Sequence, residues 1–108
     1  MAEWMAALPL AELPDHHATR ASAGGADLLL YRTGERILVV SNRCTHQGAP
    51  LHRGVVRESG SLLTVTCALH GSTFQLTDGS VLRGPAGARL PVCEGRVNGD
   101  MVEVRSTP

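Results

Sequence analysis

The chain has 108 residues, 43% of them apolar, which suits one domain with a modest hydrophobic core. Ten arginines balance ten carboxylates, so there is no global basic field for nucleic acid, and no apolar run is long enough to span a membrane. The N-terminal stretch lacks the basic start of an export signal. We therefore expect a cytoplasmic protein, and its three cysteines suit a metal site or catalysis better than a disulfide scaffold.

The pattern of apolar residues predicts short strands separated by turns. Residues 1–13 fit a strand or a short helical turn, and residues 12–25 fit a polar loop around a short segment. The strands expected after this loop are 27–31, 36–41, 55–56, 61–67, 74–76, 80–82, 89–94 and 100–105. Glycine-containing turns at 33–35, 58–60, 77–79 and 98–99 join them into hairpins. The pattern predicts an all-β protein, an antiparallel sandwich or barrel that forms a single domain over residues 1–108.

Two short segments each offer one thiol and one imidazole. The first box (residues 44–51) contains Cys44 and His46, and the second box (residues 67–74) contains Cys67 and His70. Cys44 and His46 can face one site only from an extended or turning chain, because residues two apart point to different sides of a helix. Each box follows a predicted strand, with a hairpin between them. We therefore expect the boxes to lie side by side at a loop-rich end of the molecule.

Gly48 in the first box and Gly71 in the second allow unusual backbone angles and close approach to a ligand. They also leave backbone N–H groups free to point at an anionic sulfur. Two cysteines and two histidines can hold one tetrahedral zinc ion, or a [2Fe–2S] cluster with thiolates on one iron and imidazoles on the other. Zinc motifs usually pair ligands of one type, whereas each box here is mixed. This favours the cluster, although the spacing alone leaves both candidates open.

Taken together, the two boxes resemble the cluster-binding boxes of Rieske proteins. The loop Gly84-Pro85-Ala86 and the strand at Leu90-Pro91 are similar to those of Rieske-type ferredoxins that serve bacterial aromatic-ring oxygenases. The resemblance runs from about Leu28 to Val104. It implies the Rieske fold, with one [2Fe–2S] cluster per chain in a cluster-binding subdomain of about residues 43–86.

The resemblance also assigns roles to residues of both boxes and of the third loop. Cys44 and Cys67 would hold the inner iron, and His46 and His70 the outer iron, which cycles between ferric and ferrous. The residues expected to bind the cofactor without ligating iron are Gly48, Gly71, Ser72 and Pro85.

Three positions depart from other Rieske proteins. The subunits of respiratory complexes carry an extra cysteine in each box, and these two form a disulfide; here the positions hold Ala49 and Leu69. A family tyrosine that donates to a cysteine sulfur is replaced by Phe74, whereas the serine that donates to a bridging sulfur is matched by Ser72. Fewer donors to sulfur disfavour the reduced cluster. The resemblance therefore implies a potential in the lower part of the range of about −150 to +300 mV.

The function implied is that of a monomeric one-electron carrier, not an enzyme, between a flavin-dependent ferredoxin reductase and a terminal oxygenase. The alternatives are a Rieske-like small subunit of an assimilatory nitrite reductase and a structural zinc-binding interaction domain. The partner surface is expected at the tip formed by the boxes and the third loop, with Arg53 and Arg83 at its border.

Three other features of the sequence are expected to lie outside the site. We expect Cys93 to be a small buried residue and His52 to lie on the surface. Asp15, His16 and His17 superficially suggest a mononuclear iron site, but three consecutive side chains cannot converge on one ion. That segment is expected to be a solvated loop, and the sequence leaves the roles of His52 and of the N-terminal segment open.

Overall fold

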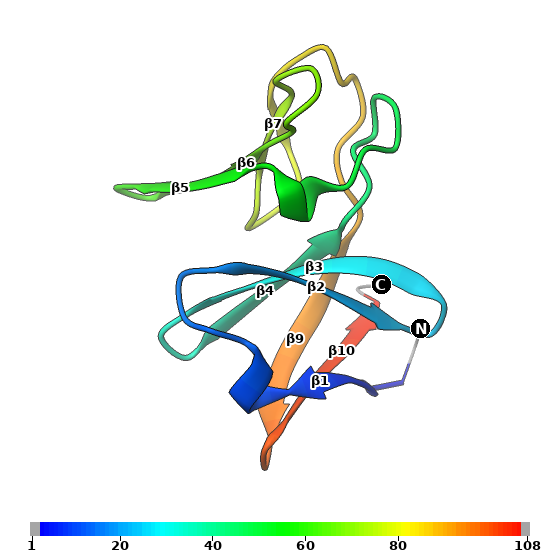
Figure 1. The fold of residues 1–108 in the computed structure, drawn as a ribbon, viewed down its shortest axis with the longest axis vertical. Helices are drawn as coiled ribbons and strands as arrows, with labels where there is room; N and C mark the ends of the chain where they lie inside the picture. The colour runs from blue at the N-terminus through cyan, green and yellow to red at the C-terminus, as the bar shows by residue number, and fades with distance from the viewer. Residues whose placement is uncertain (1–2, 107–108) are drawn as a thin grey trace.

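The computed structural model describes residues 3–106, and the fold is all β, as the sequence predicted. These residues form ten strands and two single-turn 3-10 helices (Figure 1). The elements are β1 (Met5–Pro9), η1 (Leu10–Glu12), β2 (Ala18–Ala23), β3 (Ala26–Thr33), β4 (Arg36–Ser41), η2 (Leu51–Arg53), β5 (Val55–Ser59), β6 (Leu62–Thr66), β7 (Thr73–Gln75), β8 (Val81–Arg83), β9 (Val92–Asn98) and β10 (Met101–Ser106).

The strands form two antiparallel sheets in two lobes. The base lobe (residues 3–42 and 91–106) holds a six-stranded sheet in the order β1-β10-β9-β4-β3-β2. Contact between β1 and β2 nearly closes this sheet into a barrel. The loop lobe (residues 43–90) holds a four-stranded sheet in the order β5-β6-β7-β8, and its loops gather at the end of the molecule away from β1 and β10 (Figure 1).

Strand β3 joins the two hydrophobic cores because it is buried on both faces. Leu28 and Leu30 pack in the core of the base lobe, whereas Leu29 and Tyr31 pack in a second core beneath the loop lobe. Side chains of a strand alternate between its two faces, so an uninterrupted leucine run is what a doubly covered strand requires. The second core extends upward to both box cysteines, which places the boxes on a packed floor.

Residues 12–25 were predicted to be a polar loop around a short segment, and that segment is a full strand of the base sheet, β2. Strand β2 pairs with β3 from Ala18↔Tyr31 to Ala23↔Ala26. Its sequence, ATRASA, has one β-branched residue, so its tertiary pairing prevails over a weak local preference. The other expected strands are present; β4 has the predicted ends, and the ends of the rest are shifted by a few residues, so that β9, for example, begins at Val92 and runs on to Asn98.

The N-terminal segment forms both structures that its sequence suggested, the strand β1 followed by the turn η1. Residues 1 and 2 of the predicted segment lie outside the described residues. Among residues 3–106, no helix has the length and apolar character needed to cross a membrane.

Candidate metal centre

The two boxes have the same backbone hydrogen bonds. In the first, Cys44 N–H donates to the Ala49 carbonyl (2.9 Å), and Gly48 N–H donates to the Cys44 carbonyl (2.7 Å). In the second, Cys67 and Gly71 make the corresponding bonds at 2.8 and 3.1 Å. Both glycines are in the left-handed region, with φ of +72° and +75°. The sequence prediction of unusual backbone angles is therefore confirmed, and each box is a tight loop that a side-chain-bearing residue at the glycine would strain.

Within these loops the four candidate donors are sorted by type and by depth. The thiols of Cys44 and Cys67 are buried, in residues 3% and 2% exposed, and neither forms a disulfide. His46 and His70 are exposed, and their rings meet edge to face with centroids 4.9 Å apart. No group of three or more His, Cys, Asp or Glu residues in the range 3–106 is placed to hold one metal ion. Sorted by burial, the four candidate donors form an inner pair of thiols and an outer pair of imidazoles.

The third loop, which contains the cis peptide Gly84-Pro85, is tied to both boxes. Ala86 N–H donates to Ser72 Oγ at 3.0 Å, and the Thr45 hydroxyl donates to the Ala88 carbonyl. Ser72 is fully buried, and because its oxygen accepts from Ala86, its own O–H remains available as a donor. Ser72 thus lies where a hydroxyl proton can be offered beneath the third loop, while Pro85 is exposed on that loop.

This arrangement of donors fits a mixed-ligand two-iron cluster, in which two thiolates hold one iron and two imidazoles hold the other. Comparison with protein families gives the same answer: the model for the Rieske [2Fe-2S] domain matches residues 3–94. The chain belongs to the Rieske [2Fe–2S] domain family. Its cofactor is one [2Fe–2S] cluster per chain, as predicted.

Individual Rieske relatives are similar over nearly the whole chain. The ferredoxin component of the naphthalene 1,2-dioxygenase system from Pseudomonas aeruginosa is 24% identical over 102 residues, 94% of each chain. The carbazole 1,9a-dioxygenase ferredoxin of Nocardioides aromaticivorans superposes with a TM-score of 0.86 at 23% identity, over 98% of this chain and 100% of that one. A putative NADH-dependent nitrite reductase small subunit from Mycobacterium tuberculosis gives 0.83 at 24% identity, over 100% and 99%. These two structures share the Rieske fold with this chain.

Asn42, a residue that the sequence analysis missed, supports the first box of this Rieske domain from below. It is fully buried; its N–H donates to the Asp27 carbonyl at 2.9 Å, and its carbonyl accepts from Leu51 N–H at 2.7 Å. Its side chain accepts from His52 N–H at 2.8 Å and meets His52 Nδ1 at 2.9 Å. Asn42 therefore holds together the two chain segments that enter and leave the box, the end of β4 and the turn η2. His52 is half-buried in this contact, and not the surface residue that was predicted.

Asp27 links Asn42 to two arginines. Its carboxylate accepts from Asn42 Nδ2 at 3.3 Å and from Arg20 Nε at 2.8 Å, and it pairs with Arg43 Nε at 3.2 Å. Burial raises the pKa of this carboxyl, but the hydrogen bonds from Arg20 and Asn42 and the two positive charges outweigh that effect and lower it. Asp27 therefore stays ionised and fixes Arg43, the residue next to Cys44.

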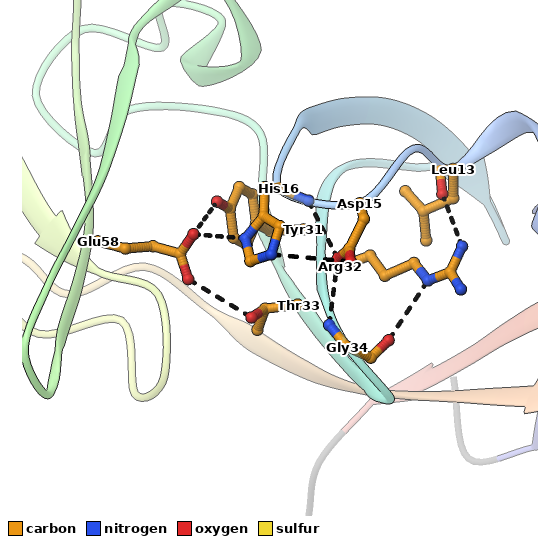
Figure 2. Close-up of polar contacts among 8 residues, drawn as sticks. All are labelled: Leu13, Asp15, His16, Tyr31, Arg32, Thr33, Gly34 and Glu58. Atoms are coloured by element: carbon orange, nitrogen blue, oxygen red, sulfur yellow. Dashed lines mark hydrogen bonds and ion pairs between the residues drawn. The ribbon is translucent and has the colours of Figure 1, made fainter.

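The Rieske loop lobe is joined to the base lobe by a second polar network (Figure 2). Glu58 of β5 accepts from the Tyr31 hydroxyl at 2.8 Å, and its Oε2 lies 2.6 Å from His16 Nδ1. Thr33 also reaches Glu58, and Asp15 accepts from Gly34 N–H at 3.1 Å. The segment containing His16 is exposed as predicted, yet His16 adopts a φ of +54° that brings its ring to Glu58.

These contacts shift the pKa values of both partners across the lobe boundary. Burial, followed by the hydrogen bond to Glu58, raises the pKa of Tyr31 to about 12. The hydrogen bonds from Tyr31 and His16 lower the pKa of Glu58. Tyr31 therefore favours its protonated form and Glu58 its ionised form, which are the forms that make the Tyr31–Glu58 hydrogen bond. This bond fastens the β5–β6 hairpin to the base lobe.

Proposed function

We propose that this Rieske domain is a one-electron carrier in which Cys44 and Cys67 ligate the inner iron and His46 and His70 the outer iron. The observation that carries the proposal is the depth order of these side chains, with thiols on the buried floor and touching imidazoles at the exposed tip. When bound, the cluster supplies a single reversible electron. The exposed edges of His46 and His70 offer the shortest path through the protein between that electron and a partner docked at the tip.

The residues around the donors prepare this site before any partner arrives. The buried Ser72 hydroxyl can donate to a sulfur, which stabilises the added negative charge of the reduced state. Gly48 and Gly71 fix the turn of each box, and Pro85 lies on the loop that is tied over both. We propose that these four residues contact the cofactor as the Rieske resemblance implied.

The partners proposed are a flavin-dependent ferredoxin reductase as donor and a terminal oxygenase as acceptor, with the chain as a monomeric carrier in the cytoplasm that catalyses no reaction itself. The support is the similarity, over nearly their full lengths, to the ferredoxin component of a dioxygenase system. The similarity in fold to a nitrite reductase small subunit supports a second candidate, a subunit of that enzyme. Co-purification with a nitrite reductase large subunit, instead of electron transfer to an oxygenase, would favour that candidate.

The test is the spectrum of the purified protein and of two histidine variants. Wild type should be red-brown with two irons per chain, and its reduced form should give the electron-spin signal of a cluster with mixed ligands. His70→Cys should shift the potential sharply downward or lose the cluster. The matched control His17→Cys, which changes an exposed histidine of the base lobe, should leave both unchanged. A colourless protein with one zinc ion, or a His70→Cys spectrum identical to wild type, would refute the proposal.

A further inference from the structure

The chain has no net charge, but its charges are separated between the two lobes. The loop lobe has five arginines against two carboxylates and therefore a net charge of +3; the base lobe, with residues 1 and 2 adding none, has five arginines against eight and a net charge of −3. The loop-lobe residues are Arg43, Arg53, Arg57, Arg83, Arg89, Glu58 and Asp78. Because the lobes lie at opposite ends of a molecule 39 Å long, the protein is an electrostatic dipole whose positive end carries the boxes.

The two carboxylates of the loop lobe do not pair with Arg53, Arg57 or Arg83. Glu58 is held by Tyr31 and His16 of the base lobe, and Asp78 accepts from the Ser80 hydroxyl at 2.7 Å. The guanidinium groups of Arg53, Arg57 and Arg83 are exposed. None of these three has an ion-pair or hydrogen-bond partner among residues 3–106. Three uncompensated cations therefore remain available to another molecule.

Arg53 lies in an apolar recess between the two boxes. The recess has a volume of about 260 Å³ and is lined by Ala49, Pro50, Arg53, Ala68 and Leu69. Leu69, next to the proposed ligand His70, is 65% exposed. Arg83 ends β8 and enters the third loop, so a second free cation lies at the other loop of the tip. An apolar centre with arginines around it is typical of the middle of a protein interface.

We propose that this tip docks a redox partner whose contact face is acidic. An apolar side chain of the partner would enter the recess, and carboxylates of the partner would pair with Arg53 and Arg83. The proposal rests on the carrier function and adds the charge of the partner surface. The cluster does not cancel the field, because two ferric ions balance two sulfides and two thiolates, and the imidazoles are neutral. Reduction lowers the charge of the lobe only from +3 to +2, so an acidic partner is attracted in both redox states.

The test uses the reduced holoprotein and two small oxidants of opposite charge, ferricyanide and hexaammineruthenium(III), each of which takes one electron. Stopped-flow rates are measured between about 10 and 500 mM salt, a range over which screening removes long-range attraction. A positive tip predicts that the ferricyanide rate falls with salt and the ruthenium rate rises. A carrier that behaves by its overall charge, which is −1 after reduction, predicts the reverse. That reverse result would overturn the proposal.

Two single-charge variants locate the effect. Arg53→Gln should lower the ferricyanide rate at low salt by about two- to threefold and weaken its salt dependence. The matched control Arg36→Gln removes one exposed arginine without a side-chain partner from the base lobe and should change the rate little. Equal effects from the two variants would show that net charge, and not the tip, controls the rate, which would refute the proposal.

A measurement that does not depend on electron transfer completes the design. The redox-inert anion hexacyanochromate(III) should broaden the NMR signals of Arg53, Ala68 and Leu69 in the oxidised holoprotein more than those of the base lobe. Uniform broadening, or broadening confined to the base lobe, would contradict an anion-binding tip. A holoprotein that reduces neither oxidant would refute the carrier function, whereas its broadening pattern would still report the charge of the tip.

Discussion

Gly54 is a point where the segment that follows the first box packs against the residue that precedes the second box, and its replacement gives a direct test of the site. A Cβ atom at this position would lie 3.0 Å from the carbonyl carbon of Thr66 and 3.1 Å from the Leu51 carbonyl oxygen, with the Thr66 oxygen closer still. Thr66 directly precedes Cys67, and Leu51 ends the first box. Gly54 has an ordinary φ of −82°, so it is the space, and not the backbone angle, that requires glycine.

The size of the effect of Gly54→Ala follows from these contacts. The neighbours are backbone atoms, which cannot rotate away as a flexible side chain can, so the Thr66 segment must move by about 1 Å to restore van der Waals contact. Overpacking of this kind costs about 2–3 kcal/mol, a large part of the stability of a small domain. For a chain of this size, that corresponds to a loss of roughly 10–20 °C in Tm. The displacement also reaches Cys67, so the variant should bind less iron.

The assay is thermal unfolding of the holoprotein followed by circular dichroism, with iron content measured on the same samples. Gly87→Ala is the matched control, because a Cβ there meets no atom within 4 Å and the residue is outside the left-handed region. The control should keep the Tm and two irons per chain. If Gly54→Ala does the same, the packing of the first box on the second does not position Cys67, and the reasoning fails.

Two further predictions concern single hydroxyl groups. Phe74→Tyr should raise the reduction potential, since Phe74 is fully buried in the core that contains both box cysteines and a new donor there can stabilise the reduced state; an unchanged or lower potential in protein-film voltammetry would contradict this. Tyr31 is the one tyrosine of the chain, so the tyrosinate absorbance reports on this residue alone. Its midpoint should lie near pH 12 instead of 10.0, and Glu58→Gln should lower that midpoint. The contribution of Tyr31 to stability is complete below pH 10 and is lost as the pH rises toward 12.

The boxes could be predicted from sequence because their geometry is local. Each thiol, imidazole and glycine lies within five residues of the others, so their spacing already encodes the turn. Strand β4 was predicted with its exact ends for the same reason, since Ile37, Val39 and Val40 are strong strand formers and turn residues precede them. Where the information lies in neighbouring residues, a single sequence is enough.

The features that the sequence could not reveal depend on contacts between distant segments. Asn42 is one polar residue at the end of a strand, and only the return of the chain at Leu51 and His52 shows that it supports the first box. Tyr31 and Glu58 are 27 residues apart, and neither has a local signature of the bond between them. Gly54 looks like any turn glycine until the second box is packed against it.

The two boxes share one backbone frame but place their histidines differently, and this asymmetry shapes the tip. His46 lies two residues after Cys44, whereas His70 lies three residues after Cys67. Because the backbone bonds of the boxes match, Leu69 occupies in the second box the position that His46 occupies in the first, and Gln47 corresponds to His70. The rings therefore approach from non-equivalent positions and meet at 88°, and Leu69 is left exposed beside the recess. One frame thus gives both the paired imidazoles and the apolar residue against which a partner can dock.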